Sequence, residues 1–306
     1  MIVVFGSLVV DMLKRVERFP RPGETVLCPD YQLVPGGKGA NQAVAAARAS
    51  AAEMPVYMIG TVGSDAFADQ ALSVLDESPV DTRYVARGSL PTAVASIGIV
   101  PSGENSIILA TGANRASRAD QVPDALLGPE TWLLLQLEVT LEENWALIER
   151  AKERGARVVL NAAPTMAVPE DVISRCDYLI VNEIEARAVA GGETDPVDAA
   201  RSLHDRHGVT TIVTLGPEGA RAFSGGGHWS VGALHINAID STGAGDAFVA
   251  TLTAAMAEGS NLPNAMELAS AGGGLACLSV GCQTAFADRV EIENRATNLD
   301  SSRPID

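Results

Sequence analysis

Apolar residues occur in short runs, and each run is followed by a turn and then by a segment with helical spacing of apolar positions. The alternation is most regular after residue 131. The runs predict strands at 1–10, 56–62, 132–137, 157–161, 178–181 and 211–215, with helices such as 141–154 between them. Repeated strand–helix units predict an α/β fold with a mostly parallel sheet covered by helices on both faces.

Two regions interrupt this alternation. Residues 11–35 contain prolines, which exclude a central strand. Residues 93–100 and 106–110 read as two strands joined by the turn Pro-Ser-Gly-Glu-Asn, a hairpin pattern. We therefore expect a separate small sheet, built from about 11–35 and 91–110, within a single domain that spans residues 1–306.

Polar side chains stand at the ends of several predicted strands. In open parallel sheets, ligands bind beyond the carboxyl ends of the strands. We therefore expect chemistry at these positions: Asp11, Glu138, Asn161, Asn182, Glu185 and Asp246.

The stretch Asp-Ser-Thr-Gly-Ala-Gly-Asp at 240–246 lies between a strand-like run at 235–239 and an apolar helical run from Ala247. Gly243 and Gly245 thus fall on a turn before a helix N-terminus. Backbone N–H groups there lack helical partners and lie at the positive end of the helix dipole. This arrangement predicts an anion site.

Asp246 is unusual beside an anion site, because its carboxylate would repel a bound phosphate. It could instead accept a proton from a hydroxyl that attacks that phosphate. Acidic residues are also common in the first turn of a helix without any catalytic role. The stretch alone leaves both interpretations open.

A second glycine-rich turn, Gly-Gly-Lys-Gly-Ala-Asn at 36–41, precedes an alanine-rich helix predicted from Gln42 to about residue 52. The Gly-Lys pair suggests a phosphate-binding P-loop. A P-loop needs Ser or Thr after the lysine, and Gly39 stands there. The pattern therefore excludes that motif.

The chain carries a net charge of −16 and shows no basic patch, which excludes a nucleic-acid-binding surface. No apolar run reaches the roughly 20 residues that span a bilayer, so no membrane partner is expected. The four cysteines lack zinc spacing and are expected to be buried. The N-terminus reads as a strand and not as an export signal, which favours the cytoplasm.

Two histidines and the chain end need separate mention. His204 and His207 have ligand-like spacing, but they lie in a charged helix, and we expect no metal there. Residues 291–306 are polar and acidic at their end. Such a segment is expected to fray.

Several motifs together resemble the ribokinase group of the PfkB carbohydrate-kinase family. The resemblance runs through nearly the whole chain in order. It rests on Gly6-Ser7 with Asp11, Arg21-Pro22-Gly23-Glu24-Thr25, the 36–43 motif Gly-Gly-Lys-Gly-Ala-Asn-Gln-Ala, Asn182-x-x-Glu185, the 214–219 motif Thr-Leu-Gly-Pro-Glu-Gly, and the 240–248 motif.

The resemblance implies an ATP-dependent kinase that phosphorylates a primary hydroxyl of a ribose-like sugar. It implies a ribokinase-like three-layer sandwich with a central sheet of about eight or nine strands and a small β-sheet lid. In relatives the lid often forms a dimer contact, so a homodimer through the lid is expected.

The resemblance also assigns roles by position. Asp246 would be the general base, and the N–H groups of Gly243, Ala244 and Gly245 the anion hole. Asn182 and Glu185 would organise magnesium-bound water, although they also fit a simple helix start. Thr214, Gly216 and Gly219, with Gly245, would line ATP, although 214–219 also fits an ordinary strand–turn segment.

The family's sugar contacts match Asp11, Gly37, Lys38, Asn41, Glu138 and Asp246. Lys38 and Glu138 also fit a solvated loop charge and a surface acid. Relatives bind a monovalent cation, K⁺, at positions that match Asp240, Thr242, Ala276, Ser279 and Gly281.

The chain departs from the family at three positions. Val9 replaces the usual sugar-binding Asn, and so removes a hydrogen-bond donor and acceptor. Ala285 replaces a serine common at the cation site, and Ser270 stands where His or Asn is common near adenine. The loss of the amide at position 9 argues against ribose itself, and the substrate alternatives are a deoxy sugar, another pentose, a sugar acid or a nucleoside. A nucleoside kinase and a non-catalytic sugar sensor are the competing functions.

Overall fold

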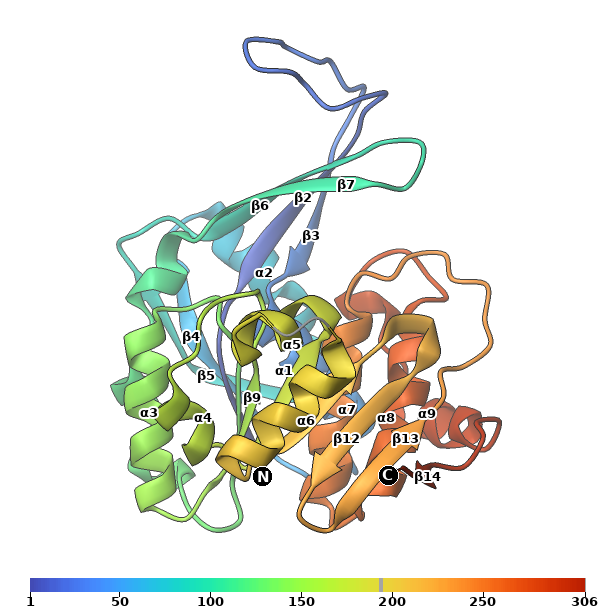
Figure 1. Cartoon of the computed structure of the whole chain (residues 1–306). Helices are drawn as coiled ribbons and strands as arrows, with labels where there is room; N and C mark the ends of the chain where they lie inside the picture. The colour runs from blue at the N-terminus through green and yellow to red at the C-terminus, as the bar shows by residue number, and fades with distance from the viewer. Residues whose placement is uncertain (193–194, 306) are drawn as a thin grey trace.

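The computed structural model describes residues 1–192 and 195–305. A large sheet lies between two layers of helices, and a small sheet projects away from it (Figure 1). This arrangement confirms the expected α/β fold with a separate small sheet.

The large sheet has ten strands within the described residues, in the order β14-β13-β12-β11-β10-β9-β8-β1-β4-β5. The seven strands from β11 to β5 are parallel, and β12, β13 and β14 add an antiparallel edge. Their bounds are β1 Ile2–Phe5, β4 Val56–Gly63, β5 Val80–Gly88, β8 Trp132–Leu135, β9 Arg157–Asn161, β10 Tyr178–Asn182, β11 Thr210–Thr214, β12 Ala220–Ser224, β13 Gly227–Val231 and β14 Arg303–Pro304.

Helices cover both faces of this sheet. One layer contains α1 Lys38–Ala49, α2 Ala66–Asp76, α7 Ala244–Ala257, α8 Leu262–Ala276 and α9 Arg289–Ala296. The other contains α3 Leu141–Glu153, α4 Glu170–Arg175, α5 Glu183–Ala190 and α6 Pro196–His207. Alternate residues of β1 enter the two cores, Val4 on the first side and Val3 on the second. A continuous apolar strand sequence follows from burial on both faces.

The small sheet has the order β3-β2-β6-β7. Its strands are β2 Val9–Arg15, β3 Gln32–Gly36, β6 Ala93–Ile99 and β7 Asn105–Ala110. The strand predicted at 1–10 is therefore wrong as one element, because the chain leaves the large sheet after Phe5 and enters the small sheet at Val9. The two sheets are joined by only three residues here.

Two more boundaries differ from the sequence prediction. Residues 235–239 form no strand, because β13 already pairs with β12 on one side and β14 on the other. Helix α1 begins at Lys38 and not at Gln42, because Gly37 caps it with a φ of 91°. The Lys-Gly-Ala-Asn segment is thus the first helical turn, and its side chains point from a rigid helix.

The end of the chain is ordered where fraying was expected. Helix α9 packs Ile292 into the core, and β14 pairs with β13. Among the described residues, no helix is long and apolar enough to cross a membrane.

Candidate active site

The Gly-Ala-Gly turn lies at the start of α7. Gly243 is the helix N-cap with a φ of 79°, and a Cβ atom there would stand 2.2 Å from Cys282 Sγ. Both the left-handed backbone and the close sulfur require glycine. The Ala244 N–H, one of the three groups expected to form the anion hole, donates to the Ser241 carbonyl at 3.2 Å and closes the turn, so it must be shared with or released to a bound anion. The turn therefore has the helix-start geometry that favours an anion.

Asp246 lies on the first turn of α7 and is only 7% exposed. Its Oδ1 accepts a hydrogen bond from Gln42 Nε2 at 2.9 Å, and its Oδ2 accepts one from Asn41 Nδ2 at 2.9 Å. A carboxylate that only favoured the helix dipole would stay in solvent. The burial and the two amide donors instead fix both carboxylate oxygens toward α1.

A chain of buried amides continues from these donors. Gln136 Nε2 donates to Gln42 Oε1 at 2.6 Å, and Gln42 Nε2 also donates to Asn161 Oδ1 at 2.9 Å. On the other side, Gln283 Nε2 donates to Asn41 Oδ1 at 3.1 Å. An ionised carboxylate only accepts hydrogen bonds, so Asn41 and Gln42 must turn their NH₂ groups toward Asp246. Their amide oxygens then face outward and accept hydrogen bonds from the next amides, Gln283 and Gln136.

Sequence reasoning missed three of these amides as site residues: Gln42, Gln136 and Gln283. Gln42 did lie within the glycine-rich motif. The other two carry no local signal, because a buried glutamine in an apolar strand or a short turn resembles any polar exception. Only the fold shows that they converge.

Glu138, which follows β8, contacts the first residue of α1. Its Oε2 accepts hydrogen bonds from Ser7 Oγ at 2.6 Å and from the Lys38 backbone N–H at 3.0 Å. It thus satisfies a free N–H group of the helix start. Glu138 is held inside the site and is not a surface acid at a strand end.

Asp11 reaches the same region from β2 of the small sheet. Burial, followed by the neighbouring charges of Glu138 and Asp246, raises the pKa of Asp11 to about 7 against the opposing effect of Lys38. The charge interactions show that Asp11 of the small sheet lies near Glu138, which follows β8, and near Asp246 of α7.

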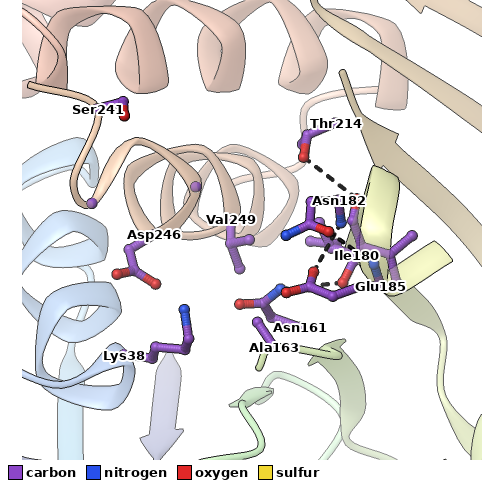
Figure 2. Close-up of a pocket in the computed structure, with 13 residues that line it drawn as sticks. Lys38, Asn161, Ala163, Ile180, Asn182, Glu185, Thr214, Ser241, Asp246 and Val249 are labelled. Atoms are coloured by element: carbon purple, nitrogen blue, oxygen red, sulfur yellow. Dashed lines mark hydrogen bonds between the residues drawn. The ribbon is translucent and has the colours of Figure 1, made fainter. Parts of the chain in front are cut away.

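Lys38 extends from the first position of α1 into the space between Asp246 and Asn161 (Figure 2). Burial lowers the pKa of Lys38, but the carboxylates of Asp246, Glu138 and Glu185 outweigh it and the net pKa is raised. Lys38 is therefore a charged member of the site and not a solvated loop lysine.

Asn182 and Glu185 form a capping box at the start of α5. Asn182 Oδ1 accepts from the N–H groups of Ile184 and Glu185, and Glu185 Oε2 accepts from the Asn182 N–H, all at 2.9 Å. The helix-start interpretation is therefore correct. Both residues also face the cavity that contains Asp246 and Lys38 (Figure 2).

This first cavity has a volume of about 250 Å³ and a polar lining. The pKa of Glu185 is raised, mainly by burial; the Asn182 N–H and Lys38 oppose the shift, and Asp246 adds to it. The residues that line this first cavity are Lys38, Asn161, Ala163, Ile180, Val181, Asn182, Glu185, Thr214, Ser241, Gly243, Gly245, Asp246 and Val249.

A second, more apolar cavity of about 390 Å³ adjoins the first. Thr214 and Gly245 line both cavities. Gly216 and Gly219, two further residues predicted to line ATP, also lie in its wall. Ser270 is there too, but its hydroxyl donates to the Gly232 carbonyl at 2.6 Å. That hydroxyl is already committed to the backbone.

Three of the predicted cation residues, Asp240, Thr242 and Gly281, are in direct contact. Thr242 donates to Asp240 Oδ1 through its N–H at 2.9 Å and its hydroxyl at 2.7 Å, and the Gly281 N–H approaches Asp240 Oδ2 at 3.4 Å. Ala276 ends α8, and Ser279 follows in the loop toward Gly281. The described residues contain no cluster of three His, Cys, Asp or Glu side chains suited to a metal ion.

The cysteines and histidines play other parts. Cys176 and Cys282 are buried as expected, but Cys28 and Cys277 are half-buried, so the expectation of burial for all four is wrong. Cys277 lines the second cavity. His204 bonds the Val209 carbonyl, and His207 bonds Ser174 Oγ.

The comparisons with known proteins assign this fold and its two adjoining cavities to the phosphotransferases that act on a sugar hydroxyl. The model of the pfkB family carbohydrate kinases matches residues 1–289. The chain belongs to this family, in its ribokinase-like group.

Individual relatives agree. The chain is 33% identical to a ribokinase of Haemophilus influenzae over 297 residues, which covers 95% of this chain and 96% of the relative. It is 33% identical to a deoxyribokinase of Salmonella typhi over 293 residues, covering 93% and 95%.

Solved structures agree as well. The ribokinase of Thermotoga maritima superposes with a TM-score of 0.89 at 28% identity, covering 97% of this chain and 99% of that one. The Arabidopsis thaliana ribokinase, complexed with ribose and ATP, gives 0.87 at 29% identity, covering 96% and 98%.

Proposed function

We propose that this chain transfers the γ-phosphoryl group of ATP to the primary hydroxyl of a ribose-like sugar. Asp246 is the general base, and the Gly243, Ala244 and Gly245 N–H groups form the anion hole. The observation that carries this proposal is the buried Asp246 carboxylate, held by two amides beside a helix start. The Arabidopsis ribokinase complex with ribose and ATP supports the choice of ligands.

In the proposed reaction, the sugar oxygen attacks the γ-phosphorus and its proton passes to Asp246. The new O–P bond forms as the bond from the γ-phosphorus to the bridging oxygen breaks, and ADP leaves. Helix-start N–H groups stabilise the charge on the transferred group, which is the main requirement of phosphoryl transfer. Asp246 lies on the first turn of the helix whose start forms the anion hole, so base and anion hole are held by one element.

We assign the sugar to the space between the two sheets. Asp11, Lys38, Asn41 and Glu138 would contact its hydroxyls, with Gly37 supplying backbone, because sugar recognition needs directional polar groups. The nucleotide would lie along Thr214, Gly216 and Gly219 in the second cavity.

Glu185 and Asn182 fit a magnesium site that acts through water. Asn182 Oδ1 and Glu185 Oε2 accept hydrogen bonds in the capping box, and both residues also line the first cavity. Mg²⁺ usually keeps several of its waters in phosphate sites. When bound, the ion would neutralise charge on the phosphate groups. Asp240, Thr242 and Gly281 are the part of the proposed K⁺ site with direct contacts.

In this proposal, residues of the small sheet determine which sugar is bound. Val9 is 2% exposed and packs with Ala93, Ala95 and Ile97. Val9 and Asp11 lie two residues apart on β2 and thus on one face. An apolar surface beside Asp11 fits a sugar with fewer hydroxyl partners, such as a deoxypentose. This keeps the deoxy sugar open as a substrate beside ribose.

A nucleoside kinase remains the second candidate. The nucleoside kinase of Methanocaldococcus jannaschii has the same fold at 20% identity and a TM-score of 0.79. The apolar face around Val9 would tolerate a base. The sensor alternative is disfavoured, because binding alone does not need a buried base beside an anion hole.

ATP as the phosphoryl donor and four free thiols both fit a cytoplasmic enzyme. We further propose a homodimer through the small sheet. Strand β7 exposes Ile107 and Ile108, and the neighbouring loop exposes Leu27 and Tyr31. Apolar side chains of this size at one end of the molecule favour a covered surface.

An ADP-release assay with ATP, Mg²⁺ and K⁺ over pentoses, deoxypentoses, hexoses, sugar acids and nucleosides tests the proposed function. We expect turnover on a free pentose or deoxypentose. Turnover only on nucleosides would favour the second candidate. Silence on the panel, with thermal stabilisation by a sugar, would favour the sensor.

The variant Asp246→Asn tests the assigned base in the same assay. The amide keeps the shape but cannot take the proton, so we expect kcat to fall by about 10² to 10⁴. Sugar binding, measured by calorimetry, should persist and show that the variant is folded. A rate near that of the unchanged enzyme would refute the role of Asp246.

A further inference from the structure

Three polar side chains form a row across the antiparallel edge of the large sheet. Arg221 on β12 is paired with Ser230 on β13, and Ser230 is paired with Arg303 on β14. Directly opposed residues of neighbouring strands project to the same face. The two arginines therefore flank the serine on one face, near the C-terminus of the chain (Figure 1).

The polar groups of this row have donors that are not used within the described part of the chain. Among residues 1–192 and 195–305, no carboxylate forms an ion pair with Arg221 or Arg303, and Arg221 Nη1 donates only to the Ala220 carbonyl. Ser230 is 5% exposed, and its hydroxyl has no hydrogen-bond partner in the described part of the chain. The hydroxyl oxygen itself is not buried, so it is free to contact a ligand. Two guanidinium groups without a carboxylate partner, beside a free hydroxyl, favour a bound anion.

These groups line a cavity of about 150 Å³, which also contains Ser301, Glu218 and Asp300. We propose that this cavity binds the phosphate group of a small phosphorylated molecule. Guanidinium groups match phosphate oxygens with paired hydrogen bonds, and the hydroxyls of Ser230 and Ser301 add donors. The phosphate group is the shared chemistry, whether it is free phosphate or part of a sugar phosphate.

The two acidic residues favour a sugar phosphate over free phosphate. Glu218 and Asp300 are exposed in the cavity wall. Carboxylates repel a bare phosphate but accept hydrogen bonds from sugar hydroxyls. A ligand with a phosphate at one end and hydroxyls at the other satisfies both kinds of lining group.

The cavity is separate from the proposed catalytic cavities. Glu218 belongs to the 3₁₀ turn η4 Gly216–Glu218, whose Gly216 and Pro217 line the nucleotide cavity. Gly232 borders the new cavity, while the next residue, Ala233, borders the nucleotide cavity. The two cavities thus border neighbouring residues of the same turn and strand end but share no lining residue.

Calorimetry on the full chain tests the proposal. Ribose 5-phosphate and inorganic phosphate are titrated separately into protein saturated with Mg²⁺ and a non-hydrolysable ATP analogue, which fills the anion hole. We expect ribose 5-phosphate to bind at one site. Arg221→Gln and Arg303→Gln should each weaken this binding about tenfold or more, because each removes a charged donor. Arg295→Gln, an exposed arginine on α9 outside the cavity, is the control and should leave the affinity unchanged.

The outcomes are distinguishable. Tighter binding of ribose 5-phosphate than of phosphate supports a sugar phosphate, and equal binding supports free phosphate as the ligand. No binding to the analogue-saturated protein overturns the proposal. Equal affinities in the unchanged protein and in both cavity variants would also overturn it. Unchanged thermal unfolding of the variants shows that lost binding is not lost folding.

Discussion

Asp11 gives the site a pH dependence that belongs to a single residue. Burial and the charges of Glu138 and Asp246 raise its pKa to about 7. The ionised carboxylate accepts hydrogen bonds from sugar hydroxyls at both oxygens and more strongly than the protonated acid, whose O–H is a donor. We therefore expect kcat/KM for the sugar to rise between about pH 6 and pH 8, mainly through a falling KM. In Asp11→Asn this rise should be absent, and a rise of the same size in the variant would contradict the assignment.

The same residue affects stability with a definite sign. The pKa is higher in the folded than in the unfolded chain, so the folded state binds more protons between pH 4 and pH 7. Stability from this group is therefore lost as the pH rises through about 7. Asp11→Asn should remove that loss. Thermal unfolding at pH 5.5 and pH 8 measures it in both proteins.

Val9 tests the choice of sugar at the scale of one side chain. The resemblance places an amide at this position, and Val9 packs instead with Ala93 and Ala95. A site that loses a hydrogen-bond partner loses discrimination for the matching hydroxyl. We expect Val9→Asn to raise kcat/KM for ribose relative to 2-deoxyribose by about tenfold. Val9→Ala is the control for altered space, and no change in the ratio with Val9→Asn would show that the amide does not set the substrate.

At this scale the sequence predicted the charged groups better than the amides. Asp246 and Lys38 occur in motifs, Glu138 follows a predicted strand, and all three lie together in the structure. Gln42, Gln136 and Gln283 could not be inferred, because they come from three separate segments. Their importance depends on contacts that close only when α1, β8 and the 3₁₀ turn η5 Gln283–Ala285 pack together.

At the scale of elements, the start of α7 joins the anion hole to the core. Gly243 has a left-handed backbone, and its missing Cβ leaves room for Cys282 Sγ. We expect Gly243→Ala to strain the turn by about 1–2 kcal/mol and to displace the N–H groups from the phosphate. The loss of one such donor lowers kcat by about 10² to 10³, which the ADP-release assay measures.

The other end of the same helix supplies the control. Gly259 also has a left-handed backbone, with a φ of 90°, but nothing lies within 4 Å of a Cβ there. Gly259→Ala should lower the melting temperature through the same strain while kcat stays unchanged. Equal activity losses in the two variants would show that the effect of Gly243→Ala is only destabilisation.

Element prediction succeeded where the pattern was strong and failed at edges. The parallel strands β8 to β11 have apolar runs and were found within one or two residues. Strands β5, β12, β13 and β14 were missed. β5 and β14 are the edge strands of the large sheet, and all four mix polar and apolar residues between turns. The helix at Lys38 was placed four residues late, because the Gly-Lys-Gly sequence disfavours a helix locally and only tertiary packing against Ser7 and Glu138 fixes it.

At the scale of the whole molecule, the small sheet leaves large apolar side chains exposed that a single chain does not cover. It is joined to the body through short connections, and its far end carries Leu27, which is 87% exposed, and Ile108, which is 74% exposed. Large apolar side chains in solvent at one end of a molecule favour association. A closed symmetric pair would use the same surface on both partners.

Light scattering on the full chain checks this expectation. We expect a dimer at micromolar concentration, and Ile108→Glu should convert it to a monomer because a buried charge without a partner is costly. Val290 on α9 is similarly exposed, at 65%, and Val290→Glu should leave the dimer intact. A monomer in the unchanged protein, or a dimer that survives Ile108→Glu, would contradict an interface at this end. Because Asp11 lies on β2 of the same sheet, loss of the dimer should also raise the KM for the sugar more than it lowers kcat.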